Sequence, residues 1–266
     1  TEIENREKDC CCEAVFMEYA RLIKSSDSRV AALSMTDPIL ANCRRMMPKK
    51  FDELENPKSN LASEIITTDG VTLGKFYLND NRTPVGYNDL SSHLVDNLVA
   101  TEDERFYEHS GIDIRRTFTA IAQLGRKGGG STITQQWAKL LIGRPDTEGM
   151  GTVRRYWTIF TTKLTEWLTA VQLEKAYTKE EVITLYLNEF DFLYGADGIR
   201  SAAETYFGKH PQDLSVVESA MLVRMLKNPS LYNPRKYPDN AIKGREQVLY
   251  NMHNKGHLTR EEYDQL

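Results

Sequence analysis

An acidic triplet followed by an aromatic residue and a histidine marks the chemically most informative stretch of the sequence, ATEDERFYEHSGID at 100–113. If this stretch is helical, Glu102, Phe106 and His109 share one face, and Gly111 ends the turn. A carboxylate in partly apolar surroundings holds a proton more readily than one in water, which suits a general base. Glu102 is therefore the candidate base, although such an acidic triplet is more often a solvated helix start.

A second stretch, GGGSTITQQWAKLL at 128–141, combines a glycine-rich loop with a helix start. Glycines let the backbone approach a ligand, and a helix N-terminus favours an anion such as pyrophosphate. Gln135, Gln136 and Lys139 follow at i, i+1 and i+4, so we expect amide donors and an ammonium group on one side of the helix. On the glycines alone, a flexible loop before a capped helix is the favoured alternative.

A third stretch, TKLTEWLTAVQLEKAYTKEEVITLYLN at 162–188, places a cation beside a second carboxylate. Lys163 and Glu166 are one helical turn apart, and the small Ala170 leaves room on the same face. A solvent-facing ion pair of this kind usually contributes little, and that is the alternative interpretation. A fourth stretch, at 192–209, indicates packing and offers no chemistry of its own.

The elements around these stretches predict a mainly α protein. From about residue 90 the apolar spacing is helical, and one long helix is expected from Val153 to Tyr177. Earlier in the chain, alternating residues around Asp69-Gly70, between Ser63 and Leu78, predict a β-hairpin. Helix starts with capping boxes are expected at Thr132/Gln135, Thr178/Glu181, Ser215/Glu218 and Thr259/Glu262.

The bulk composition limits what such a protein can do. With 266 residues and 40% hydrophobic content, the chain can bury a sizeable core. Its formal net charge of -4 gives no global basic field, which argues against nucleic acid as a partner. The four cysteines all lie in the first 43 residues, so no disulfide framework holds the main body, and their spacing does not suit a metal site. No run of 18 apolar residues is present, so the sequence shows no transmembrane anchor.

Taken together, the motifs resemble the glycosyltransferase domain (glycosyltransferase family 51) of class A penicillin-binding proteins and their monofunctional relatives. That family's pattern reads EDxxFxxHxG, GxSTIxQQxxK, RKxxExxxAxxLE, KxxILxxYLN and RxxVL. The same five motifs stand here, in the same order, as EDERFYEHSG, GGSTITQQWAK, TKLTEWLTAVQLE, KEEVITLYLN and REQVL. This ordered match favours Glu102 as a catalytic base over the solvated helix start.

The resemblance implies a lysozyme-like, two-lobed fold whose smaller, apolar lobe dips into the membrane surface. It divides the chain into an unassigned segment at 1–46, a linker with the hairpin at 47–90, and a peptidoglycan glycosyltransferase domain at 91–266. It implies lipid II and the nascent glycan strand as substrates, at the outer face of the cytoplasmic membrane, with cell-wall synthesis proteins as candidate partners. No cofactor is obligatory and no protein metal site is expected; a divalent cation, Mg²⁺ or Mn²⁺, is an optional addition.

The implied reaction is an inverting displacement in which an acceptor hydroxyl attacks the anomeric carbon and lipid pyrophosphate leaves. By resemblance, Glu102 takes the proton of the acceptor 4-hydroxyl, and Glu166 is the second catalytic carboxylate. Lys139 and Lys163, with the two glutamines, neutralise or orient the departing pyrophosphate. The implied substrate-binding residues are Asp103, Phe106, His109, Ser131, Thr132, Gln135, Gln136, Lys139 and Lys163.

One position departs from the family pattern, because Thr162 stands where the family has arginine and a phosphate-binding guanidinium is missing. Arg154 and Arg155, one or two turns earlier, are the candidates to replace it. The departure keeps a second hypothesis open, a degenerate domain that binds lipid II or acts as a scaffold without turnover. A glycan-cleaving enzyme of lysozyme-like fold is less favoured, because a hydrolase of neutral glycan needs no pyrophosphate site for Lys139 and Lys163.

Overall fold

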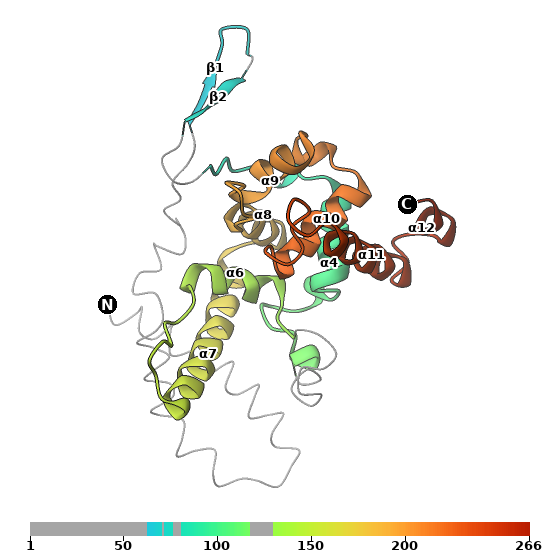
Figure 1. Ribbon diagram of the computed structural model, residues 1–266. Coiled ribbons are helices and arrows are strands. Elements are labelled where there is room, and N and C mark those ends of the chain that lie inside the picture. The colour runs from blue at the N-terminus through green and yellow to red at the C-terminus, as the bar shows by residue number, and fades with distance from the viewer. Residues whose placement is uncertain (1–62, 71, 77–80, 118–129) are drawn as a thin grey trace.

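A computed structural model shows the architecture of the chain (Figure 1). It describes residues 63–70, 72–76, 81–117 and 130–266. The unassigned segment 1–46 with its cysteines, the start of the predicted linker, and most of the glycine-rich run before Ser131 lie outside the described residues.

A β-hairpin precedes the helices. Its strands, β1 (Ser63–Ile66) and β2 (Thr72–Phe76), are antiparallel, with Ser63 opposite Phe76. Gly70 has a φ of +84°, a conformation that favours glycine and allows the tight turn. The predicted hairpin is confirmed, and Figure 1 shows it standing clear of the helices.

Helices make up most of the remaining described chain. They are α4 (Ser92–Glu102), α6 (Ile133–Ile142), α7 (Thr152–Ala176), α8 (Lys179–Glu189), α9 (Gly198–Phe207), α10 (Val216–Lys227), α11 (Pro238–Asn254) and α12 (Arg260–Gln265). One short 3₁₀ turn, η1 (Tyr87–Asp89), precedes α4, and two more, η2 (Phe106–Glu108) and η3 (Pro211–Asp213), lie between helices. The mainly α prediction is confirmed, and α7 agrees with the expected long helix to within one residue at each end.

Capping side chains explain where several helices begin. In a complete capping box the cap hydroxyl accepts from the backbone N–H three residues on, and the carboxylate there accepts from the cap residue's own N–H. Three predicted boxes are confirmed, at Thr178, Ser215 and Thr259. At α6 only half of the box forms: Thr132 accepts from the Gln135 N–H at 3.1 Å, but the Gln135 side chain has turned elsewhere.

The apolar core lies where α4, α8, α9, α10 and α11 meet. α6 packs against both α7 and α8 and so connects α7, which runs away from the other helices in Figure 1, to this core. The fully buried core residues include Leu94, Leu98, Ile183, Leu187, Ile199, Leu222 and Val248.

The chain between the hairpin and α4 is bound to the helical body. The Asn188 side chain of α8 donates to the Val85 carbonyl at 2.9 Å and accepts from the Val85 N–H at 3.1 Å. The Asn81 N–H donates to Asp197, the N-cap residue of α9, at 2.9 Å. These bonds fix the end of the predicted linker to α8 and α9, while the domain boundary at 90/91 stays a prediction.

Candidate functional site

Glu102 is the last residue of α4, and the chain leaves the helix directly after it. Asp103 is the C-cap residue, Phe106 begins η2, and Gly111 has a φ of +84°. Glu102, Phe106 and His109 therefore do not share one helical face, and that prediction is wrong. Asp103 accounts for the end of the helix. Its short polar side chain contacts the Ile133 N–H and the His109 ring, and a continuing helix would not bring these groups within its reach.

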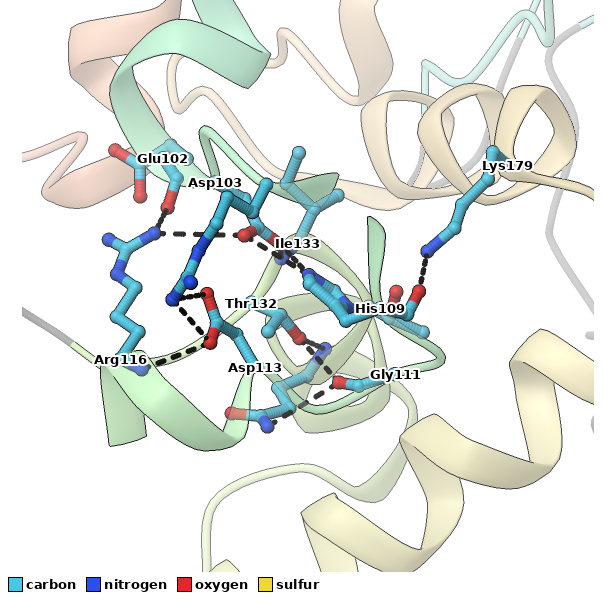
Figure 2. Close-up of polar contacts among 12 residues, drawn as sticks. Glu102, Asp103, His109, Gly111, Asp113, Arg116, Thr132, Ile133 and Lys179 are labelled. Carbon is cyan, nitrogen blue, oxygen red and sulfur yellow. Dashed lines mark hydrogen bonds and ion pairs between the residues drawn. The ribbon is translucent and has the colours of Figure 1, made fainter. Parts of the chain in front are cut away.

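Asp103 anchors the turn that follows α4 (Figure 2). Its side chain is fully buried, and Oδ2 accepts from the backbone N–H of Ile133, the first residue of α6, at 3.1 Å. His109 Nε2 lies 3.1 Å from the same oxygen, and Arg116 Nη1 lies 3.7 Å from Oδ1. A carboxylate at a helix N-terminus is stabilised there by the helix dipole and by the amide donor. Asp103 thus ties the turn to the start of α6.

A largely buried ion pair holds the other side of the turn. Lys179 Nζ lies 2.5 Å from Glu174 Oε2 and donates to the His109 carbonyl at 2.6 Å. The same ammonium lies 4.3 Å from the centroid of the buried Phe106 ring, within range of a cation–π interaction. Glu174 also accepts from Thr134 Oγ1 at 2.5 Å. Phe106 and His109 are therefore fixed in place by residues of α6, α7 and α8.

Gly111 brings the turn into direct contact with α7. A Cβ atom at this position would lie 2.7 Å from the Ala170 carbonyl oxygen, so only glycine fits. The Gly111 carbonyl accepts from Thr132 Oγ1 at 2.7 Å and from Gln135 Nε2 at 3.4 Å. Gln135 is therefore buried while Lys139 is exposed, and the prediction that both glutamines lie beside Lys139 is wrong for Gln135.

Glu102 keeps a partly exposed carboxylate with a fixed hydrogen bond. Its Oε2 accepts from Gln136 Nε2 at 2.8 Å, and Gln136 Oε1 accepts from the Tyr186 hydroxyl at 2.8 Å. Arg116 Nη1 donates to the backbone carbonyl of Glu102. Burial, with a smaller contribution from the Glu102 charge, raises the pKa of Tyr186 well above its ordinary value. Within the described residues, the remaining acceptor positions of the Glu102 carboxylate are open.

The second predicted carboxylate belongs to a partly buried pair on α7. Lys163 Nζ lies 2.5 Å from Glu166 Oε2 and donates to Ser131 Oγ at 3.0 Å. The Glu166 side chain is 8% exposed and that of Lys163 is 38% exposed. The pair is therefore not a solvent-facing surface bridge, and Lys163 keeps part of its ammonium group accessible.

The segment 131–136 joins the two carboxylates into one region. Its last residue, Gln136, bonds Glu102, and its first, Ser131, bonds Lys163. Lys139, one turn further along α6, is exposed and forms no ion pair within the part of the chain that the structure describes. A partly exposed carboxylate and two accessible ammonium groups thus flank one loop and the first turn of one helix, an arrangement suited to proton removal and to an anionic leaving group.

Comparison with known proteins gives the family. The family model described as transglycosylase matches residues 69–253. The chain belongs to the transglycosylase family. It is 35% identical over 205 residues to penicillin-binding protein 1F of Bacillus subtilis, and 40% identical over 176 residues to penicillin-binding protein 2a of Streptococcus pneumoniae. It is 33% identical over 216 residues to penicillin-binding protein 1A of Escherichia coli.

These three alignments cover 76%, 66% and 80% of this chain but only 27%, 23% and 24% of the relatives. The transglycosylase chain therefore spans about a quarter of the length of these curated relatives. A crystal structure of penicillin-binding protein 1A from Haemophilus influenzae matches 77% of this chain and 20% of its own, with 23% identity and a TM-score of 0.41. The predicted family is confirmed.

The described part of this transglycosylase was also compared with the requirements for a membrane-spanning helix and for a metal site. None of its helices there has both the length and the apolar character needed to cross a membrane. Its described residues also contain no group of three or more His, Cys, Asp or Glu side chains placed to hold a metal ion.

Thr162, which stands where the family pattern has arginine, is buried. The Thr162 hydroxyl donates to the Thr158 carbonyl of its own helix at 2.8 Å. Arg154 and Arg155, its candidate replacements, are exposed in the first turn of α7, and their side chains bond no residue of the described ranges. The guanidinium that the structure places beside the candidate base is that of Arg116.

Several residues of this region were missed by sequence reasoning. Lys179 and Tyr186 belong to the motif KEEVITLYLN, so membership of that motif was the available signal for them. Arg116 stands outside the motifs, and no pattern in the sequence marks it. Its role depends on a contact with the end of α4, 14 residues away in the chain.

Proposed function

We propose that this transglycosylase polymerises lipid II into glycan strands. The growing chain, carried on lipid pyrophosphate, is transferred to the 4-hydroxyl of an acceptor disaccharide with inversion at the anomeric carbon. The observation that carries the proposal is the segment 131–136, which bonds the carboxylate of Glu102 at one end and the ammonium of Lys163 at the other. A base and a cation are thereby placed on the two sides of one candidate reaction site.

Glu102 acts as the general base. Its open carboxylate positions accept the proton of the acceptor hydroxyl as the new bond to the anomeric carbon forms and the bond to pyrophosphate breaks. A positioned base of this kind contributes about 10²–10⁴ to the rate. The hydrogen bond from Gln136 holds the carboxylate in place.

Lys163 and Lys139 neutralise the charge that develops on the leaving pyrophosphate. Both ammonium groups are accessible, and Ser131 lies within 3.0 Å of Lys163 Nζ, where its hydroxyl can also contact a phosphate oxygen. Glu166 acts on Lys163, because its buried carboxylate holds the ammonium toward Ser131. Donors fixed before the reaction stabilise developing charge without reorganising.

The buried members of the predicted substrate-binding set act by positioning. Asp103, Phe106, Thr132 and Gln135 have almost no exposed surface, and their contacts hold the turn 103–111 against α6 and α8. His109 is largely buried and bonds Asp103. A substrate therefore contacts Glu102, Ser131, Lys139 and Lys163, while these five residues keep the region in shape.

The exposed start of α7 binds the membrane surface that carries the lipid substrate. Large apolar side chains are exposed there: Val153, Tyr156, Trp157, Ile159 and Phe160. An apolar patch of this kind is typical of an interaction site, and aromatic residues suit the membrane interface. The location is the outer face of the cytoplasmic membrane, where cell-wall synthesis proteins are candidate partners.

No cofactor is obligatory in this proposal, and a divalent cation would accompany the pyrophosphate rather than a protein site. The lysines supply positive charge next to the leaving group from the chain itself. Polymerisation measured in EDTA and in added Mg²⁺ or Mn²⁺ tests this, because complete loss of polymer in EDTA would show an obligatory metal.

The decisive experiment compares two neighbouring glutamates. Labelled lipid II is incubated in detergent with the parent, with Glu102→Gln and with Glu104→Gln, and polymer is followed on gels. Glu104 is an exposed carboxylate paired with Lys255 at 2.8 Å, so it controls for the loss of one charge at this place. We expect a loss of about 100-fold or more in Glu102→Gln and about parental rates in Glu104→Gln.

Two outcomes would contradict the proposal. Parental polymerisation by Glu102→Gln would exclude this carboxylate as the base. Lipid II binding without polymer from the parent would support the degenerate, binding-only domain, and release of soluble fragments from finished glycan would support the glycan-cleaving alternative.

A further inference from the structure

Tyr186 of α8 reaches the candidate base through one intermediate side chain. Its hydroxyl donates to Gln136 Oε1 at 2.8 Å, and Gln136 Nε2 donates to Glu102 Oε2 at 2.8 Å. The Tyr186 side chain is only 1% exposed, so it does not contact a substrate itself. Three residues from α8, α6 and α4 therefore form one hydrogen-bonded chain that ends on the carboxylate.

Chemistry allows this chain to run in one direction only. An ionised Glu102 carboxylate can only accept, so the amide nitrogen of Gln136 must face it. The amide oxygen then faces Tyr186, which must donate. Burial, and to a smaller extent the Glu102 charge, raises the pKa of the Tyr186 hydroxyl well above its ordinary value, so this donor keeps its proton. A reversed amide would set its oxygen against the carboxylate and lose the bond to Glu102, while its nitrogen would face the Tyr186 oxygen.

We propose that Tyr186 is a positioning residue that holds the Gln136 side chain where it donates to Glu102, and that it thereby sets the direction of the Glu102 carboxylate. This inference rests on the proposed polymerisation of lipid II and adds a residue that does not touch the substrate. The proposal also changes the expected role of Gln136, because its amide group donates to the base Glu102 and does not contact the leaving pyrophosphate.

Packing alone does not require the hydroxyl. The Tyr186 ring packs edge-to-face on Phe190 with centroids 6.1 Å apart, and a phenylalanine ring would keep that contact. A buried hydroxyl is unfavourable unless it is hydrogen-bonded, and the bond recorded for this one is to Gln136. Tyr186→Phe therefore removes the hydrogen bond and keeps the core.

The first test separates kcat from KM. In Tyr186→Phe we expect kcat for lipid II to fall about tenfold and KM to change less than about twofold, because substrate contacts remain. Tyr206→Phe is the matched control: the Tyr206 hydroxyl donates to the Phe192 carbonyl at 2.8 Å and accepts from Asn233 at 2.8 Å, outside the site. Equal losses of kcat in the two variants, or no loss in Tyr186→Phe, would overturn the proposal.

The second test is a double-mutant cycle. If Tyr186 acts through Gln136, Tyr186→Phe lowers kcat in the parent but has no further effect in a Gln136→Leu background. An equal additional loss in that background would show that Tyr186 acts independently and would overturn the proposal.

A third measurement does not depend on turnover. With ¹⁵N-labelled glutamine, the side-chain amide signal of Gln136 is identified by its absence in Gln136→Leu. We expect this signal to shift in Tyr186→Phe and in Glu102→Gln and to stay in place in Tyr206→Phe. If the parent makes no polymer, the proposed function fails, but the amide signal still tests whether Tyr186, Gln136 and Glu102 are hydrogen-bonded in series. An unshifted signal in Tyr186→Phe overturns the positioning proposal whether or not the parent makes polymer.

Discussion

The two halves of α7 have opposite relations to their surroundings. The half before Thr161 exposes large apolar side chains, among them Val153 at 85% and Trp157 at 48%. The half from Thr161 onward buries polar ones, including Thr165, Glu166 and Thr169. A helix in water normally shows the reverse, with apolar residues inside and polar residues outside. The difference agrees with the proposed roles of the two halves: the first half contacts the membrane surface, and the second half holds part of the candidate site.

Hydrogen bonding explains how the second half tolerates burial. Thr161 Oγ1 donates to the Trp157 carbonyl at 3.0 Å, and Thr165 Oγ1 donates to the Thr161 carbonyl at 3.0 Å. These hydroxyls are satisfied within α7, so they need no partner across the packing surface. Glu166 is satisfied by Lys163, which links the buried half to the loop before α6.

The largest expected effect comes from removing the cation of the buried half. Lys163→Met keeps the length of the side chain but leaves the buried Glu166 without its partner and the pyrophosphate without one ammonium. We expect polymerisation to fall about 100-fold or more. The measurement is the initial rate on labelled lipid II in detergent, with binding to lipid vesicles measured in parallel and expected to be unchanged.

Lys243→Met on α11 is the matched control, because Lys243 is exposed and forms no ion pair within the described residues. It should keep the parental rate. Comparable losses in Lys163→Met and Lys243→Met would mean that general charge, and not the α7 pair, limits the reaction.

The next largest effect concerns the exposed half. Trp157→Ser should weaken binding to anionic lipid vesicles about tenfold, because burying a large apolar side chain contributes roughly 1.5–3 kcal/mol and half of this one is already covered. The detergent rate should stay parental. Tyr250→Ser on α11 is the control, because Tyr250 is also 48% exposed. An equal loss of vesicle binding in Trp157→Ser and Tyr250→Ser would contradict the proposal that the start of α7 is the membrane-binding surface.

A smaller effect on stability is expected from helix capping, in which the start of α7 differs from the starts of the capped helices. The N-cap residue of α7 is Gly151, which supplies no side-chain cap, whereas α10 is capped by the Ser215/Glu218 box. Burial alone would raise the pKa of Glu218, but hydrogen bonds from Lys209 and Ser215 outweigh it and hold the pKa below its ordinary 4.5. The stabilisation is therefore present above pH 4.5 and is lost as the pH falls through the lowered value.

We accordingly expect Glu218→Gln to lower the free energy of unfolding by about 1 kcal/mol at neutral pH. The difference from the parent should shrink in acid, where Glu218 is protonated. The measurement is urea unfolding of the parent and of Glu218→Gln from neutral pH to below pH 4.5. A difference that grows in acid would contradict the assigned sign.

The smallest effect lies in the buried threonines. Thr169 Oγ1 is buried and has no hydrogen-bond partner among the described residues, unlike Thr165 Oγ1. Thr169→Val removes an unpaired hydroxyl and should stabilise the protein by up to about 1 kcal/mol, whereas Thr165→Val should be neutral or slightly destabilising. Thermal or urea unfolding compares the two, and a larger loss in Thr169→Val would show that its hydroxyl has an important contact.

Local features were predicted well because their causes are local. The hairpin turn at Gly70, the length of α7 and the boxes at Thr178, Ser215 and Thr259 depend on residues within a few positions of one another. The Gln135 box failed because the Gly111 carbonyl, 24 residues away, takes the amide. A long-range partner of this kind leaves no mark in a local pattern.

By itself, the sequence determined the family, the mainly α class, and Glu102, Lys139, Lys163 and Glu166 as the residues to examine, because motif order and helical spacing are properties of the chain. Only the tertiary structure decided that α4 ends at Glu102 and that Gln135 turns inward. It also decided that Tyr186 reaches the base through Gln136 and that Arg116 bonds the backbone carbonyl of Glu102. These outcomes depend on which buried donors and acceptors meet across separate helices. Most buried polar groups find a partner, and folding alone brings those partners together.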